Sequence, residues 1–289
     1  MSVLRPVLAA ALAELYPGAC DEALAGDAST RRFHRLVLPN GGTRVVMDYG
    51  APFVGETDDV RLARIFEQAS LPVARVLHIL PEAGALVLQD LGDDTLEVAL
   101  SRAGSGGRPA RDHLYRSAVR LAAEIATRGT EALQRSDRAR GPALDSERFL
   151  FEMRFFLEHY VGGFLGRPEV AIRVREAVEE LALAAAAHPR VLCHRDYHSR
   201  NIMVRGDGAL AMVDIQDARW GPDTYDLASL LCDAYVDLGD PEAAELSDLY
   251  WQHLPGFPDV AALRKRFDVV AAQRMIKALG TFGYQIGVL

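Results

Sequence analysis

The sequence predicts an α+β protein of two lobes, a small antiparallel sheet with one helix followed by a mainly helical lobe. Three observations predict this division. Two pairs of β-prone runs, each around a turn, lie before residue 90, and helical spacing of aliphatic residues dominates after residue 95. The helical part is interrupted once, near the middle, by a polar segment with short β-prone runs beside it. A chain of 289 residues is also long enough to bury a core in each lobe.

The first lobe is expected to begin with an amphipathic helix rather than a signal peptide, because Glu14 interrupts the apolar run. The Asn-Gly step in the turn at 39–42 is a strong hairpin signal for the runs on either side of it. In chain order, the expected elements are a helix within 1–18, a polar loop at 26–30, strands at 32–38 and 43–47, a helix at 58–69, and strands at 74–80 and 85–89.

The second lobe is predicted from aliphatic residues at three- and four-residue steps. The lobes are expected to meet near 90–94, which divides the chain into an N-terminal lobe, 1–91, and a C-terminal lobe, 92–289. The expected helices are 111–133, 146–160, 168–187, 224–235, 242–253 and 260–280, with strands at 191–193, 202–204 and 209–213 in the interruption.

Charge and composition exclude several classes of function. The net charge of −8 argues against a general nucleic-acid binder, because phosphate backbones need a basic face. The three cysteines form no C-x-x-C pair, which favours free thiols in a reducing compartment over a disulfide framework. No apolar run approaches the length of a bilayer span. A cytoplasmic protein with a small-molecule partner, and without nucleic acid or membrane, is therefore expected.

The polar interruption carries the chemistry. It reads Cys-His-Arg-Asp-Tyr-His-Ser-Arg-Asn at 193–201, which matches the pattern H-R-D-x-x-x-x-N of phosphoryl-transfer enzymes, and an expected hairpin then delivers Asp214. Phosphoryl transfer needs a carboxylate beside the acceptor hydroxyl, and Asp196 would accept or orient that proton. It also needs oxygen ligands for magnesium, which Asn201 and Asp214 would supply.

Two other interpretations of this segment are weaker. Isolated Asp and Asn residues usually cap turns, but here three of them occur at the spacing that the chemistry requires. Cys193, His194 and His198 could be zinc ligands, yet no second cysteine or histidine cluster completes a tetrahedral set.

The run HRDYHSRN, followed by MVDIQDARWGPDTYDLASLL, resembles the aminoglycoside phosphotransferase-like superfamily, which has a protein-kinase-like two-lobed fold. Within it, the chain is most similar to the N-acetylmuramate/N-acetylglucosamine anomeric kinases of cell-wall recycling. GDASTRRFHRL, VVMD, LVLQDLGDDTL and QRMIKALGTFGY add to the resemblance, which covers nearly the whole chain. The resemblance implies ATP and Mg²⁺ as cofactors and phosphate transfer to a small-molecule hydroxyl, here the anomeric hydroxyl of an amino sugar.

The resemblance also implies roles for individual residues. Asp196 would be the catalytic base, with Asn201 and Asp214 as the magnesium ligands. The adenine-contacting hinge would be Gln89, Asp90 and Leu91, while Asp226 would brace the catalytic loop and His194 would organise it.

One feature departs from the kinase pattern, because the third strand carries no lysine. The only two lysines are Lys265 and Lys277, both far from the first lobe. Arg31 and Arg32, beside the loop at 26–30, could offset the phosphate charge, since guanidinium binds phosphate well. Either arginine could equally pair with a surface carboxylate.

The acceptor is less well defined by the sequence. Acidic residues after Asp214 would suit a polycation such as an aminoglycoside, but they could equally be solvated surface. Arg219 and Trp220 could contact a sugar, although Trp220 could also be core, and His198 could touch substrate or bond to backbone. Three hypotheses remain: an amino-sugar kinase, a kinase of another small alcohol, and a catalytically weak nucleotide-binding regulator.

Overall fold

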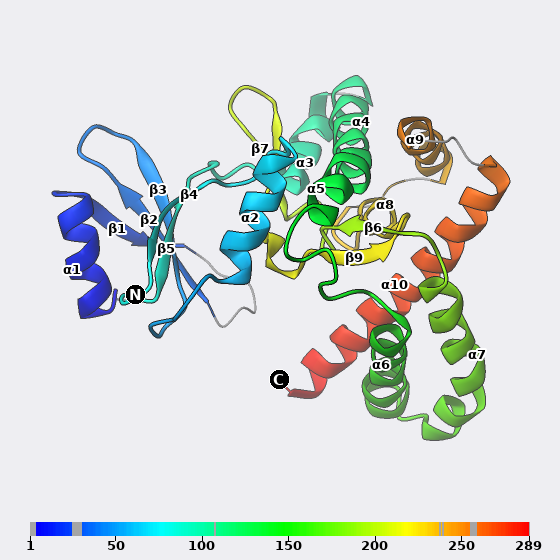
Figure 1. Ribbon diagram of the computed structural model, residues 1–289. Helices are drawn as coiled ribbons and strands as arrows, with labels where there is room; N and C mark the ends of the chain where they lie inside the picture. Colours follow the sequence, from blue (N-terminus) through cyan, green and yellow to red (C-terminus); the bar gives the residue numbers. More distant parts are fainter. Residues whose placement is uncertain are drawn as a thin grey trace.

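The computed structural model describes residues 4–24, 31–106, 108–236, 238, 240–254 and 259–288. The polar loop expected at 26–30 lies outside these residues. The described chain forms the two lobes expected from the sequence, a sheet-containing N-terminal lobe and a larger helical C-terminal lobe (Figure 1). The sheet ends at Gln89 and the next helix begins at Leu96, so the connection runs between these residues.

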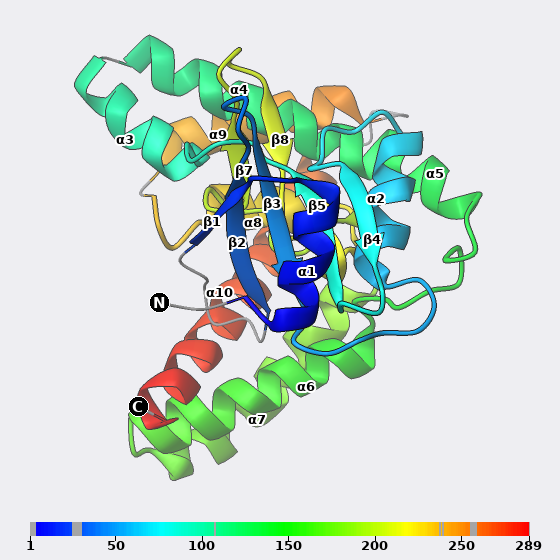
Figure 2. The same ribbon diagram turned by 90° about the vertical axis from the view of Figure 1, so that its left-hand side faces the viewer.

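The N-terminal lobe is a five-stranded antiparallel sheet in the order β1-β2-β3-β5-β4. Helix α1 covers one face, while α2 lies on the opposite face (Figures 1 and 2). Alternation along β3 explains this arrangement, because Val46 packs in the cluster under α1 and its neighbour Met47 packs with Val60 of α2. The elements are α1 (Pro6–Leu15), β1 (Cys20–Ala23), β2 (Arg32–Val37), β3 (Thr43–Asp48), α2 (Asp58–Gln68), β4 (Val76–Leu80) and β5 (Ala85–Gln89).

The C-terminal lobe contains the expected helices, with differences at their ends. The helix predicted at 224–235 ends at Leu231, and the helix predicted at 260–280 continues to Val288. The chain after Glu124 and after Phe156 widens into π-helical stretches, Ile125–Gly129 and Leu157–Phe164. The helices are α3 (Leu96–Gly106), α4 (Arg108–Glu124), α5 (Thr130–Gln134), α6 (Ser146–Phe156), α7 (Pro168–Ala186), α8 (Tyr225–Leu231), α9 (Asp240–His253) and α10 (Val260–Val288).

The C-terminal half of α10 lies against α6 and the π-helical stretch that follows it. Two glycines allow this contact: a Cβ on Gly280 would lie 2.9 Å from Phe156 Cα, and one on Gly283 would lie 2.7 Å from Tyr160 Cα. Because backbone atoms cannot give way as a flexible side chain can, only glycine fits at these two points. This contact fixes the face that α10 presents to the rest of the lobe.

Two small sheets frame the polar interruption. Strand β7 (Ile202–Val204) pairs with β8 (Leu210–Met212) as the expected hairpin, and β6 (Arg190–Cys193) pairs with β9 (Arg219–Pro222). Strand β9 was not predicted, because Gly221 and Pro222 are poor strand formers and its partner is distant in the chain. Pairing β6 with β9 closes the segment between them into one compact loop region.

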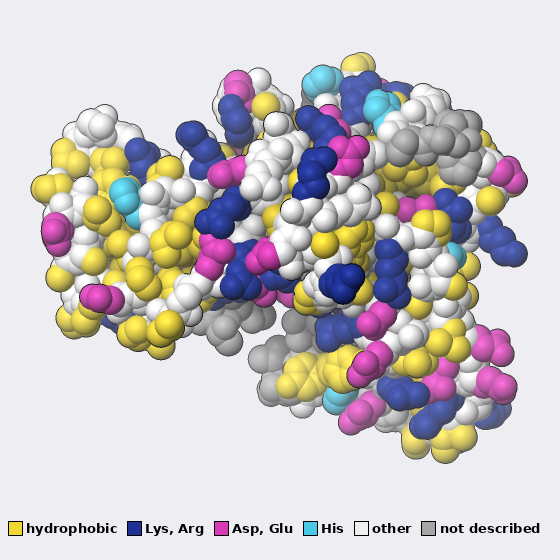
Figure 3. Space-filling view, in the orientation of Figure 1, with side chains coloured by type: hydrophobic (Ala, Val, Ile, Leu, Met, Phe, Trp, Pro, Cys, Tyr) yellow, Lys and Arg dark blue, Asp and Glu magenta, His cyan; other side chains and the backbone are white. Residues whose placement is uncertain are grey.

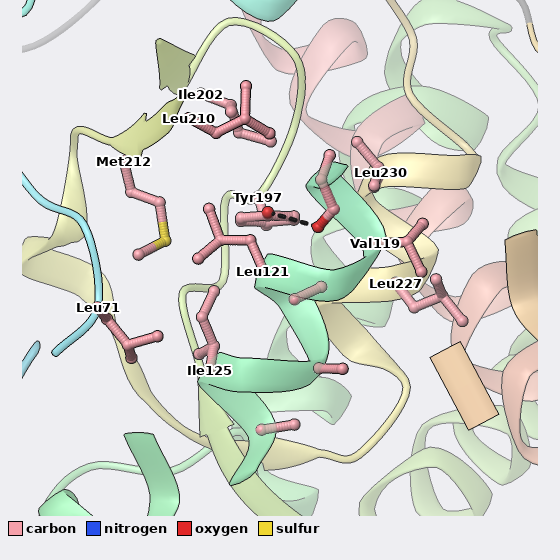
Figure 4. Close-up of a cluster of buried hydrophobic side chains, with 14 of the residues drawn as sticks. Leu71, Val119, Leu121, Ile125, Tyr197, Ile202, Leu210, Met212, Leu227 and Leu230 are labelled. Atoms are coloured by element: carbon pink, nitrogen blue, oxygen red, sulfur yellow. Dashed lines mark hydrogen bonds between the residues drawn. The ribbon is translucent and has the colours of Figure 1, made fainter. Parts of the chain in front are cut away.

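Tyr197 anchors this region in the largest hydrophobic cluster (Figure 4). Its ring is fully buried among aliphatic side chains, and its hydroxyl donates a hydrogen bond to the carbonyl oxygen of Ala118 on α4 at 2.8 Å. Burial of a ring of this size stabilises the fold by about 2 kcal/mol or more. The residues on either side of Tyr197 are therefore held at a fixed depth on the surface.

The surface of the molecule is mixed in character. Hydrophobic side chains are frequent on the outer part of the N-terminal lobe, and basic and acidic side chains lie side by side where the lobes meet (Figure 3). None of the described helices combines the length and apolar character needed to cross a membrane.

Candidate active site

The expected catalytic loop, within residues 193–201, is tied to helix α8 through a buried carboxylate. Asp226 accepts hydrogen bonds from the backbone N–H groups of His194 (2.7 Å) and Arg195 (3.0 Å). Burial raises the pKa of Asp226, although His194 and these hydrogen bonds lower it. The ring of His194 is fully buried, and its Nε2 lies 2.9 Å from the carbonyl oxygen of Val213. These contacts of Asp226 and His194 are the ones expected of residues that brace the loop.

Two residues of the site adopt a backbone conformation that non-glycine residues rarely use. Arg195 has φ 81° and Asp214 has φ 62°, both in the left-handed region. Each such residue costs on the order of 1–3 kcal/mol and persists only where the surrounding structure holds it. Such strain is frequent at functional sites, because it aims a side chain that a regular backbone would direct elsewhere.

The hairpin β7–β8 brings the expected metal ligands together. The backbone N–H of Val213 donates to the carbonyl oxygen of Asn201 at 3.1 Å, so Asp214 follows directly beside Asn201. The side-chain amide of Asn201 donates to the carbonyl oxygen of Asp196 at 3.0 Å, which fixes the amide orientation. Asn201 and Asp214 therefore lie next to each other, and the Asn201 side chain reaches the backbone of Asp196.

Asp196 lies among cationic side chains. Its Oδ2 is 3.7 Å from Nη1 of Arg195, and its Oδ1 is 3.7 Å from Nζ of Lys277 on α10. Burial alone would raise the pKa of Asp196, but the charges of Lys277 and Arg195 outweigh burial and hold the pKa to about 2. Asp196 is therefore ionised at neutral pH. Lys277 was not among the residues predicted for the site.

A cavity of about 510 Å³ lies between the lobes, within the range of about 300–1,000 Å³ that is usual for small-molecule sites. Apolar side chains from both lobes face it, among them Val45, Leu88 and Met212, and form surfaces suited to a flat aromatic base. The expected hinge residues Gln89, Asp90 and Leu91 line one part of its wall, while Asn201 and Asp214 line another.

The arginines of the first lobe differ in position. Arg31 lines the cavity and donates to Asp59 Oδ1 at 3.1 Å. Arg32 is exposed and shares the strand face of His34, which points away from the cavity, so the structure does not bring Arg32 into the site. Sequence reasoning missed Arg35, which lines the cavity and binds the hinge carboxylate Asp90 at 2.7 Å.

Two residues predicted to contact substrate, Arg219 and Trp220, differ in their surroundings. Trp220 does not line the cavity; it packs against the core and its indole N–H donates to the carbonyl oxygen of Ala139 at 3.1 Å. Arg219 binds Asp217 Oδ1 at 2.6 Å. Asp217 also pairs with Arg195 at 2.9 Å, so Arg219 is connected to the catalytic loop through Asp217.

His198 lies beside Asn201, one of the two expected metal ligands. Its Nε2 is 3.4 Å from the side-chain nitrogen of Asn201, and its ring meets the ring of Tyr235 edge-on. Burial lowers the pKa of His198, although Asp233 raises it, so the ring is neutral at neutral pH. A neutral ring at this place can accept or donate a hydrogen bond without adding charge.

The donor set fits magnesium better than a softer metal. Asn201 and Asp214 offer oxygen atoms, and for the Asp214 carboxylate the structure shows no protein partner among the described residues. Across the described ranges, no group of three or more His, Cys, Asp and Glu side chains could hold a metal ion alone. Two protein oxygens are what a site completed by phosphate oxygens and water requires.

A sheet lobe and a helical lobe that meet at such a cavity, with Asn201 and Asp214 in its wall and Asp196 on the adjoining loop, define a small-molecule phosphotransferase of protein-kinase-like fold. The chain belongs to the phosphotransferase enzyme family, whose model matches residues 22–263. It is 30% identical to an N-acetylmuramate/N-acetylglucosamine kinase of Neisseria meningitidis serogroup B, over 89% of this chain and 76% of the relative. A kinase of the same name from Pseudomonas aeruginosa is 32% identical, over 93% of this chain and 76% of the relative.

Solved structures share the fold at low sequence identity. A ternary complex of streptomycin, ATP and APH(2'')-IIa matches with a TM-score of 0.64 at 14% identity, covering 100% of this chain and 97% of that one. Choline kinase LicA from Streptococcus pneumoniae matches with a TM-score of 0.59 at 13% identity, covering 98% and 96%. The expected superfamily and two-lobed fold are therefore confirmed.

Proposed function

We propose that this phosphotransferase uses ATP with Mg²⁺ to phosphorylate the anomeric hydroxyl of an N-acetylated amino sugar, N-acetylmuramate or N-acetylglucosamine. The names of the relatives at 30% and 32% identity support the substrate class. The structural observation that favours an amino sugar over a cationic acceptor is the group of cationic side chains around Asp196. Use of ATP also fits the cytoplasm expected from the sequence.

The cavity between the lobes is the proposed nucleotide site. Its apolar surfaces would hold the adenine beside the hinge at 89–91, and Arg31 would offset part of the phosphate charge. Asn201 and Asp214 would hold magnesium, which, when bound, supplies positive charge to the phosphate oxygens. Asp59, which pairs with Arg31, keeps that guanidinium at the cavity wall.

Asp196 has the position and charge of the group that receives the acceptor proton. As the acceptor oxygen forms its bond to the γ-phosphorus, the bond from that phosphorus to the β,γ-bridging oxygen breaks and ADP leaves. The hydroxyl proton passes to Asp196. With a pKa of about 2, Asp196 is a weak base, so its main contribution is to orient the hydroxyl until the new bond has formed.

The acceptor side of Asp196 is rich in cations. Arg148 on α6 binds the buried Glu152 at 3.2 Å, and Arg219 and Arg195 share Asp217. With Lys277, the four cations outnumber the three carboxylates of this network, Glu152, Asp196 and Asp217. A neutral or anionic sugar suits this environment, because a polycationic acceptor would meet like charges at short range.

The catalytically weak alternative is not favoured by the geometry. Asn201 and Asp214 line the cavity, Asn201 is bonded to the backbone of Asp196, and Asp214 is held in a strained conformation beside the cavity. A protein that only bound nucleotide could use Asn201 and Asp214 for magnesium, but it would have no need for an ionised carboxylate at Asp196.

An acceptor panel tests the proposed function. The purified protein, with ATP and magnesium, should release ADP with N-acetylglucosamine and with N-acetylmuramate but not with streptomycin or choline. Phosphorus NMR of the product should show coupling of the phosphate to the anomeric proton. Turnover confined to a cationic acceptor, or a phosphate on another carbon, would contradict the proposal.

A further inference from the structure

The motif at 273–284 near the C-terminus contains residues that the site described so far does not use. The structure shows what two of them contact. Gln273 is fully buried and its amide donates to Glu152 Oε2 at 3.0 Å. The guanidinium of Arg274 lies 5.3 Å from the centre of the Tyr225 ring. These contacts fix the rotation of α10 about its own axis, and they direct Lys277 toward the catalytic loop.

Lys277 is held beside Asp196 without a direct hydrogen bond. Its Nζ lies 3.7 Å from Asp196 Oδ1, which is beyond hydrogen-bonding distance, and its side chain is 20% exposed. The structure records no hydrogen-bond acceptor for Nζ within the described ranges. An ammonium carries three donors, and a cation this far from bulk water normally uses them. The donors of Lys277 are therefore available to a ligand.

The gap between the two groups has the width that one oxygen atom would bridge. Two polar groups more than about 3.5 Å apart can be joined through a bridging oxygen. An oxygen at ordinary hydrogen-bonding distances of about 2.7–2.9 Å from both Asp196 Oδ1 and Lys277 Nζ fits a separation of 3.7 Å. In a phosphotransferase, the oxygen that belongs beside this aspartate is that of the acceptor hydroxyl.

We propose that Lys277 is a catalytic residue whose ammonium donates a hydrogen bond to the acceptor oxygen that Asp196 orients, and stabilises the negative charge that collects there as the phosphoryl group arrives. The inference rests on the proposed kinase function. The third strand of this protein carries no lysine. The proposal therefore places a lysine of the last helix, α10, at the reacting atoms.

The energetic setting is consistent with this role. Burial lowers the pKa of Lys277, although Asp196 raises it, so the ammonium is held at a cost in free energy. Lys277 keeps its proton throughout the reaction: the hydroxyl proton goes to Asp196, the new phosphorus–oxygen bond forms at the acceptor oxygen, and the leaving electron pair stays on ADP. The contribution of Lys277 is to the charge at the acceptor oxygen and the incoming phosphoryl oxygens.

The chain offers a matched control, because its only other lysine, Lys265, is exposed on the same helix. We expect Lys277→Met to lower kcat by about 100-fold or more, as loss of one preorganised donor does at other sites, with KM for ATP within about twofold. Lys277→Arg should retain part of the activity, since guanidinium also donates. Lys265→Met should match the wild type, and thermal unfolding should show all three variants folded.

A transition-state analogue gives a readout that does not depend on the acceptor. Aluminium fluoride with MgADP mimics the phosphoryl group in transfer. Wild type and Lys265→Met should bind ADP more tightly when aluminium fluoride is added. In Lys277→Met this increase in ADP affinity should be smaller by at least about tenfold, while the affinity for ADP alone should be that of the wild type. An equal gain in Lys277→Met, or a wild type that shows no gain at all, would overturn the assignment.

The two experiments separate the inference from the proposed function. If the wild type does not phosphorylate amino sugars, the proposed acceptor is wrong, and the aluminium fluoride measurement still decides the role of Lys277. If amino sugars are phosphorylated and Lys277→Met turns them over at a rate close to wild type, the assignment of Lys277 fails while the proposed function stands.

Discussion

Asp214 shows how a single residue can be strained for the sake of its position. Its backbone is left-handed, with φ 62°, two residues after the end of β8, and among the described residues its carboxylate has no protein partner and lies at the cavity. Asn and Asp tolerate this conformation better than other residues with a side chain, because their short polar groups can bond locally. Asparagine can therefore replace Asp214 to remove its negative charge while keeping its backbone conformation and side-chain shape.

Asp214→Asn should keep the fold and lose the chemistry. The free energy of unfolding should change by less than about 0.5 kcal/mol, because asparagine accepts the left-handed backbone. Turnover should fall by at least about 100-fold, because a neutral amide is a weaker ligand for magnesium than a carboxylate. Steady-state kinetics and urea unfolding check both parts. A variant with normal turnover would show that Asp214 is not a metal ligand.

At the same scale, local spacing predicted some site residues and could not reach others. Asp196 and Asn201 lie on one loop, and a short hairpin brings Asp214 back to it, so their proximity follows from the sequence near them. Lys277 comes from a helix at the far end of the chain, and no local pattern indicates that it faces Asp196. Trp220 was left open between sugar and core, and it packs against the core.

At the scale of elements, the residues that begin β2 illustrate how alternation decides function. Phe33 and Arg35 line the cavity with Arg31, while His34 and Leu36 are buried on the other face of the strand. Two adjacent arginines, 31 and 32, are equivalent candidates in the sequence, because the pattern does not tell which face of the strand meets the second lobe. The tertiary arrangement makes that choice.

Arg31 and Arg32 form a matched pair for testing this point. Arg31→Ala should raise the dissociation constant for ADP by about tenfold, because a hydrogen bond between charged groups contributes about 1.5–3 kcal/mol and solvent replaces part of it. Arg32→Ala should leave it unchanged. Calorimetric titration of each variant with MgADP makes the comparison. Equal losses in the two variants would contradict the assignment of the strand faces.

The elements themselves were predictable where they are regular. The Asn-Gly turn indicated the first hairpin and the turn at 81–84 indicated the second, and the predicted order of hairpin, helix and hairpin was confirmed. Strand β1 was missed because all four of its residues are exposed and show no apolar alternation. Helix α10 was ended too early, at Gly280, because a glycine usually weakens a helix, whereas here Gly280 and Gly283 allow close contact with its neighbour.

At the scale of the whole molecule, the site belongs to neither lobe alone. The cavity wall takes Arg31 and the hinge from the N-terminal lobe, and Asn201 and Asp214 from the other. Asp196 lies outside that wall, beside Arg195 of its own loop and Lys277 of α10. The two sides meet at the catalytic loop, which suits a reaction that joins a nucleotide to a second, differently shaped substrate.

The account depends most on Asp196 as the group at the reacting oxygen, and Asp196→Asn tests it most directly. Asn201 bonds to the backbone of residue 196 rather than to its side chain, so the loop should survive the change. Turnover with N-acetylglucosamine should fall by about 1,000-fold or more, with the dissociation constant for MgATP within about twofold of wild type. Turnover close to that of the wild type would contradict the account.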